Sequence, residues 1–183
     1  MMSKNMMNHA VGGEHSPGLG LAIYRIVLGI MWLDLCLQKA PWVFDSEGNR
    51  YGWLYGWIWT EINNPTFHWY TDFLQYFFLP HIAVMGMIVF LQELAIALSL
   101  ITGSFVPVIG GLLGLVMQIN LLIGNYSVPG EWFWTYPLLI VSHVALTLDR
   151  AGRVLGVDGW LAQRVEKDLG HTGLIGRLLA YAV

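Results

Sequence analysis

Four long apolar stretches divide this chain and leave it few folds to choose from. They cover residues 19–37, 80–101, 105–123 and 132–148. A helix needs about 17–25 mostly apolar residues to cross the hydrocarbon of a bilayer, and each stretch meets that length. Backbone polar groups inside lipid must be satisfied within the protein, which a helix does by itself. We therefore expect an all-α integral membrane protein built as an antiparallel four-helix transmembrane bundle.

The composition and length agree with one membrane domain. Hydrophobic residues make up 56% and charged residues 11% of the chain, whereas a soluble domain is about 25% charged. The net charge of −3 offers no basic surface to a nucleic acid. The sequence divides into a polar leader over residues 1–18, the transmembrane domain over 19–149 and a tail over 150–183. The tail mixes apolar and basic residues in the pattern of an amphipathic helix on the membrane surface.

The positions of the basic residues predict the orientation. Cytoplasmic flanks of membrane helices carry the excess of lysine and arginine. Only Lys39 and Arg50 lie between the first two stretches, whereas five bases follow the fourth and Lys4 precedes the first. We expect an inner (plasma) membrane protein with both termini in the cytoplasm. The segment over residues 39–79 then lies on the outer side.

This outer segment is rich in tryptophan, tyrosine and phenylalanine, and residues 53–61 have the pattern of a short helix. Tryptophan and tyrosine favour the headgroup region of a bilayer. The segment is therefore predicted to form an interfacial belt. Two alternatives remain open, a lid over a hydrophobic ligand such as a quinone and a docking surface for a partner subunit.

Three ionisable residues share one depth inside the apolar stretches and are the candidate site. A charge at the bilayer centre costs about 2.5–3.5 kcal/mol on insertion scales, so such residues usually face a partner or a cavity. Counted from the inner ends of their spans, Arg25, Glu93 and His143 lie about 9, 12 and 8 Å deep. We expect Arg25 and Glu93 to form a buried pair with a catalytic role, and His143 is a weaker third candidate. The alternative is a pair that only fixes helix packing.

Two further groups of residues are predicted from their depth and spacing. Asp34, Gln118 and Asn120 lie together nearer the outer face and form a second polar layer. Gly110 and Gly114 make a G-x-x-x-G pattern, which permits close approach of helices. We expect the glycines to pack within the bundle rather than between subunits.

Several redox devices are absent from the sequence. Cys36 is the only cysteine, so an intramolecular C-x-x-C disulfide cannot form. His143 is the only histidine near mid-membrane, so ligation of a haem by two histidines is not expected, and no metal site is predicted. The cofactor stays unknown. A quinone is the candidate, because it needs an apolar pocket, hydrogen-bond donors and a titratable group, all of which this chain can supply.

The order of several short motifs resembles the DoxX/DoxD family of four-helix membrane proteins. The resemblance covers about residues 19–161. It rests on Arg25 and Gly29 in the first span, Lys39 just beyond it, Glu93, Leu98 and Gly103 in and after the second, and Gly152-Arg153-Val154-Leu155-Gly156-Val157-Asp158 after the fourth. Ala97 stands where the family often has glycine, and Asp34 stands where a small or apolar residue is usual.

The resemblance implies a function at the membrane. The long aromatic segment is most similar to that of the DoxD branch, the membrane subunit of thiosulfate:quinone oxidoreductase. In that reading thiosulfate is oxidised on the outer face, Arg25 binds an anion or a quinone oxygen, and Glu93 accepts a proton. The alternative is a non-catalytic accessory subunit of a larger respiratory or photosynthetic complex. Other membrane subunits, or further copies of this chain, are the partners expected.

Overall fold

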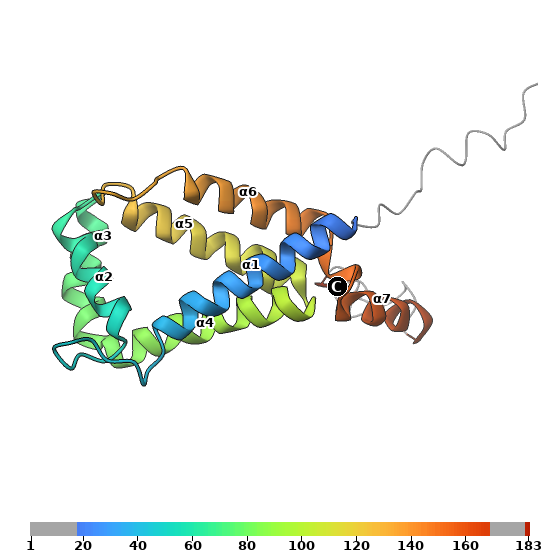
Figure 1. The fold of residues 1–183 in the computed structure, drawn as a ribbon, viewed down its shortest axis with the longest axis horizontal. Helices are drawn as coiled ribbons and strands as arrows, with labels where there is room; N and C mark the ends of the chain where they lie inside the picture. The colour runs from blue at the N-terminus through green and yellow to red at the C-terminus, as the bar shows by residue number, and fades with distance from the viewer. Residues whose placement is uncertain (1–17, 169–181) are drawn as a thin grey trace, which may run out of the picture.

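The computed structural model describes residues 18–168 and 182–183, and within these residues it contains helices and no β-strand. The predicted all-α class is therefore confirmed. The leader and most of the tail beyond Asp168 lie outside the described residues. The helices of Figure 1 are α1 (Leu19–Gln38), α2 (Gly52–Asn63), α3 (His68–Phe73), α4 (Ile82–Thr102), α5 (Gly114–Asn125), α6 (Thr135–Leu148) and α7 (Val157–Asp168).

Three continuous helical segments are long and apolar enough to cross a membrane. They are Leu19–Gln38, His68–Thr102 and Val106–Asn125, and the shorter apolar helix α6 follows them. The first and third agree with the predicted spans. The second is longer than expected, because a π-helical turn (Leu74–Phe78) and a 3-10 turn (Leu79–His81) join α3 to α4 without a break. Another π-helical segment, Val106–Leu113, leads into α5.

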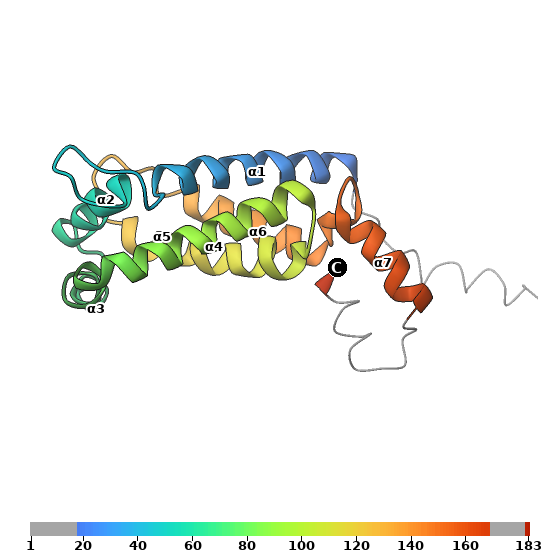
Figure 2. The ribbon, with the colours of Figure 1, turned by 90° about the horizontal axis from the view of Figure 1, so that it is seen from below.

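The long helices lie lengthwise beside one another, with α1 along α4 and α6 along α5 and the Val106–Leu113 segment (Figures 1 and 2). The contacts fix the register of the first pair. Gly29 lies against Leu100 and Ile101, and the Sγ atom of Cys36 lies 3.5 Å from the carbonyl oxygen of Phe90. Residue numbers therefore fall along α4 as they rise along α1.

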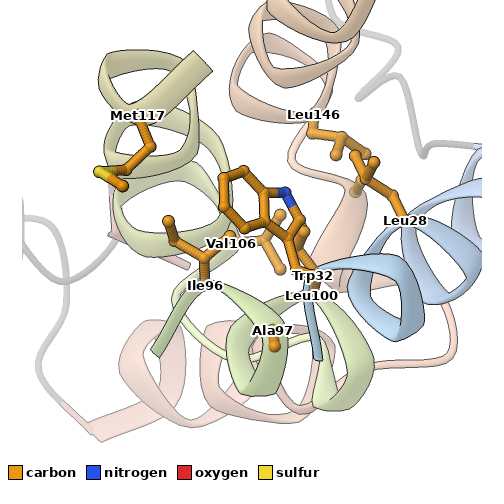
Figure 3. Packing of buried hydrophobic residues seen from close by; sticks show 9 residues of the cluster. Leu28, Trp32, Ile96, Ala97, Leu100, Val106, Met117 and Leu146 are labelled. Carbon is orange, nitrogen blue, oxygen red and sulfur yellow. The ribbon is translucent and has the colours of Figure 1, made fainter. Parts of the chain in front are cut away.

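One apolar core joins these helices, with Trp32 at its centre (Figure 3). Small residues allow the close approach. A side chain at Gly29 would collide with α4. The glycines of the predicted G-x-x-x-G also permit close packing, because Gly110 lies against Leu100 and Gly114 lies against the ring of His143. The predicted packing within the chain is confirmed at these positions.

The two ends of the molecule differ. At one end α2 and the α3–α4 segment pack together through Ile58, Tyr70 and Leu74, and at the other end α7 extends away from the long helices (Figures 1 and 2). The first we call the α2 end and the second the α7 end. The predicted short helix over residues 53–61 is confirmed as α2, one residue longer at its start and two at its finish.

Candidate functional site

A cavity of about 280 Å³ lies at the α2 end. Side chains from α1, α2, α3, α4, α5 and α6 form its wall, most of them apolar or aromatic. Its polar and ionisable lining residues are Lys39, Glu61, Tyr70, Glu93, Gln118, Asn120, Asn125, Glu131, Thr135 and Tyr136. An apolar pocket with a few convergent polar groups is the usual form of a small-molecule site.

A buried ion pair forms one part of this wall. The Nζ atom of Lys39, at the end of α1, donates to the Oε1 atom of Glu93 on α4. The side chains are 5% and 1% exposed. The same ammonium lies 5.5 Å from the centre of the Trp53 ring, within the range of a cation–π contact. Because removing one partner would leave a buried charge unpaired, these two residues depend on each other.

The predicted pair of Arg25 with Glu93 is therefore wrong. The prediction measured the depth of each residue from the end of its own span, and such depths can be compared only if the helix ends lie at the same height in the membrane. The α1–α4 register instead places Arg25 beside Gly103, just beyond the end of α4. Gly103 is ten residues after Glu93, about 15 Å along a helix. Lys39, the residue after α1, contacts the Glu93 carboxylate instead. It was not among the predicted site residues.

Arg25 belongs to a second buried polar cluster at the α7 end. Its Nη2 atom donates to the carbonyl oxygen of Leu155 at 2.9 Å. The carboxylate of Asp158 accepts backbone N–H bonds from Phe105 at 2.6 Å and Val106 at 2.9 Å. Arg25 and Asp158 are both fully buried. This cluster ties α1, the start of the third span and α7 together.

Three glycines let the backbone approach Arg25 and Asp158 closely. A Cβ atom on Gly103 or Gly156 would meet the guanidinium, and one on Gly152 would meet the Asp158 carboxylate. Burial raises the pKa of Asp158, and the two backbone N–H bonds and the charges of nearby arginines oppose that shift. The G-R-x-L-G-x-D motif is thus a packing motif in this chain.

His143 is buried and has both ring nitrogens engaged. Its Nδ1 atom lies 2.7 Å from the carbonyl oxygen of Gly110, which can only accept, so Nδ1 carries the proton. The Nε2 atom then accepts from the indole of Trp32 at 3.2 Å. Neither bond involves Arg25 or Glu93. With no free ring nitrogen, His143 holds α6 against α1 and the third span.

The predicted second polar layer forms only in part. Gln118 and Asn120 line the cavity. Asp34 does not, because it lies on the exposed face of α1 and accepts from Gln38 at 2.8 Å. The difference follows from helix geometry: depth places a residue along the axis, whereas its direction around the axis decides which side it faces.

Glu61 is, after Lys39, a second site residue that the sequence analysis missed. It lies on α2, is 5% exposed and places its carboxylate against Gly124 of α5. Burial raises the pKa of Glu61 to about 7, opposed by Asn125 and by the charge of Lys39. The available signal was that Glu61 is the only acidic residue in the run of aromatic and apolar residues from Gly52 to Asn63.

Comparison with models of known protein families, with curated proteins and with solved structures finds no match. In the part of the chain that the structure describes, no three histidine, cysteine or acidic side chains are grouped so as to hold a metal ion. Chemically, the α2-end cavity can bind an amphipathic molecule and exchange hydrogen bonds with it.

Proposed function

We propose that this chain is a quinone-binding membrane subunit, DoxX/DoxD-like in its antiparallel four-helix transmembrane arrangement, and linked to quinone-coupled electron transfer. The observation that supports it most is the α2-end cavity, which combines an apolar wall with a buried ion pair and amide side chains. Its volume of about 280 Å³ is near the lower limit for ligand pockets, about 300 Å³. It suits one ring-shaped head group.

The apolar tail of such a ligand needs a way into lipid. The cavity wall includes Met31 and Leu35 of α1 and Thr135 and Leu139 of α6. Met31 is 48% exposed on the outside of the helices. The tail would therefore pass between α1 and α6, and the ligand would enter sideways from the bilayer.

In this proposal the proton-handling groups are Glu61 and Glu93, and Arg25 has a structural role. A titratable group near a quinone oxygen can exchange protons with it. The chain supplies position, hydrogen bonds and exclusion of water, and a partner subunit supplies the electrons. With the termini in the cytoplasm, as the basic residues indicate, the cavity would lie toward the outer face, where thiosulfate oxidation by a partner is the proposed electron source.

The second candidate is a non-catalytic accessory subunit of a larger respiratory or photosynthetic complex. It is favoured by the large aromatic side chains exposed near the α2 end. Trp42, Trp69, Tyr76 and Trp132 are 62–71% exposed. Such side chains serve equally in an interfacial belt and in contacts with another membrane subunit.

Photolabelling with an azido-quinone tests the first candidate. The full chain, extracted gently from native membranes, is labelled, digested and mapped by mass spectrometry. We expect adducts on cavity-lining peptides, and their loss when Leu139→Trp fills the cavity. Leu138→Trp is the matched control, because Leu138 is 59% exposed and points away. Labelling that both variants leave unchanged would contradict the proposal.

The same extract separates the two candidates. Co-purifying chains are identified by mass, and thiosulfate-dependent reduction of a quinone analogue is measured. Activity that Leu139→Trp removes without loss of assembly supports a quinone-binding subunit. A stable complex whose activity ignores Leu139→Trp supports an accessory subunit.

A further inference from the structure

The wall of the α2-end cavity has most of its strong hydrogen-bond donors already engaged. The ammonium of Lys39 donates to Glu93, and the indole of Trp57 donates to Asn125. The hydroxyl of Tyr70 donates to Asn120 at 3.3 Å, and that of Tyr136 donates to Glu131 at 3.1 Å. The side-chain amide of Asn125 donates to the Leu121 carbonyl at 2.9 Å. The amides of Gln118 and Asn120 are the main side-chain donors of this wall that remain.

The acceptors in the same wall exceed these donors. Glu93 Oε2 and Gln118 Oε1 are buried and have no hydrogen-bond partner among the residues that the structure describes. Three carboxylates line the cavity, those of Glu61, Glu93 and Glu131, against the single basic side chain of Lys39. An ionised carboxylate only accepts, whereas an amide adds donors and acceptors in equal number. Above the pKa of about 7 that burial gives Glu61, the amides of Gln118 and Asn120 therefore do not correct the excess.

Glu61 adds a carboxylate to this wall. Lys39 is already paired with Glu93, and among the described residues Glu61 forms no ion pair. The two unpartnered acceptors belong to residues of α4 and α5 that line the cavity, so a ring bound there meets wall residues with acceptors on two helices. A buried acceptor without a donor destabilises the site, and a ligand that brings O–H groups would satisfy it. A ligand that brings only carbonyl oxygens would not.

We infer that the cavity binds the reduced, hydroxyl-bearing quinol in preference to the quinone. This inference rests on the proposed function and adds the form of the ligand that the site selects. The quinol has two O–H donors on the same ring where the quinone has two acceptors. The two forms have nearly the same shape and apolar area, so the selection comes from hydrogen bonding alone.

Calorimetric titration of the full chain in phosphatidylcholine nanodiscs, without oxygen, tests the inference. The probes are a short-chain alkyl-hydroquinone, its quinone and its dimethyl ether, which keeps the reduced ring but has no donor. We expect the hydroquinone to bind at least about tenfold more tightly than the other two, the scale of one hydrogen bond to a buried charged acceptor. Equal affinity of the hydroquinone and the quinone, or of the hydroquinone and the ether, would overturn it.

Two variants locate the effect. Glu61→Gln replaces an acceptor by an amide that also donates, so it should weaken hydroquinone binding and strengthen quinone binding, each by about threefold or more. Gln118→Met removes an acceptor at similar volume and should weaken hydroquinone alone. Glu47→Gln, in an exposed loop, is the control and should change neither. Thermal melts verify folding, and Gln118→Met carries the test if Glu61→Gln does not fold.

The outcomes separate the two proposals. Failure of all three probes to bind would refute the quinone site itself. Binding of the quinone as tightly as the hydroquinone would refute only the selection of the reduced form. Tighter binding of an alkylammonium probe than of the hydroquinone would also refute it, because the acceptors would then serve a cation.

Discussion

The two buried polar clusters of this protein, at the α7 end and at the α2 end, use similar residues in opposite ways. At the α7 end, Arg25 and Asp158 bond to backbone atoms and are surrounded by glycines. At the α2 end, the Lys39–Glu93 pair lies in the wall of a cavity. Among the described residues, both clusters hold buried side-chain atoms without a hydrogen-bond partner, Arg25 Nε and Nη1 at the α7 end and Glu93 Oε2 and Gln118 Oε1 at the α2 end. Close packing indicates a structural role, and open space beside unsatisfied groups indicates binding. The following predictions, from the largest effect to the smallest, test this difference.

Arg25→Leu should destabilise the protein most. The change leaves Asp158 buried without the nearby guanidinium, and loss of one buried charged partner costs about 3–5 kcal/mol. The free energy of unfolding in mixed micelles measures it. Arg50→Leu, at an exposed loop position, is the control. A folded Arg25→Leu protein that is as stable as the parent but no longer binds quinone would reverse the roles of the two clusters.

Lys39→Met should cost about 3 kcal/mol, because it leaves Glu93 charged and buried. Adding Glu93→Gln should recover much of the loss, since the double variant contains no unpaired charge. The coupling free energy from a double-mutant cycle measures this dependence. The pair Arg25 and Glu93 should show no coupling beyond about 0.5 kcal/mol, the range found for distant sites. Additive effects at Lys39 and Glu93 would contradict the ion pair.

Glu61 should make stability depend on pH. Its pKa is raised to about 7 in the folded protein from an ordinary 4.5, so the folded state binds the proton more tightly than the unfolded state. The contribution is complete below pH 4.5 and is lost as pH rises through about 7. Glu61→Gln should therefore match the parent near pH 4.5 and exceed its stability by about 2–3 kcal/mol at pH 8.

Unfolding titrations of both proteins across this pH range check the prediction. The groups near Glu61 that titrate or carry charge are Lys39, Tyr70, Glu93, Glu131 and Tyr136. Glu47→Gln in the exposed loop is the control. A slope that Glu61→Gln leaves unchanged would assign the pH dependence to another of these groups.

Asp34→Asn should have the smallest effect, within about 0.5 kcal/mol, as is usual for an exposed substitution. Asp34 lies on the same helix as Arg25 and carries a full charge, but its only side-chain hydrogen bond in the described structure is with Gln38. Unfolding measurements compare the two substitutions directly. An effect as large as that of Arg25→Leu would mean that the exposed face of α1 is buried against a partner.

The helical class and the positions of the helices could be predicted from the amino-acid sequence. Hydrophobic length is a local property of the chain, so the predicted stretches agree with α1, the α3–α4 segment, the Val106–Asn125 segment and α6. The sequence also showed that buried charges would be important, since charged side chains in apolar stretches need partners wherever they lie.

Which charged side chains meet could not be predicted and follows from how the helices pack. The α1–α4 register places Arg25 beside Gly103, away from Glu93, and Lys39 pairs with Glu93 instead. The fold of the aromatic segment brought Glu61, more than 30 residues before Glu93 in the sequence, into the same cavity. Register and the direction of a side chain around a helix depend on how neighbouring surfaces pack, with glycines setting the closest approach. Both are properties of two packed helices, so they cannot be derived from the sequence of one helix alone.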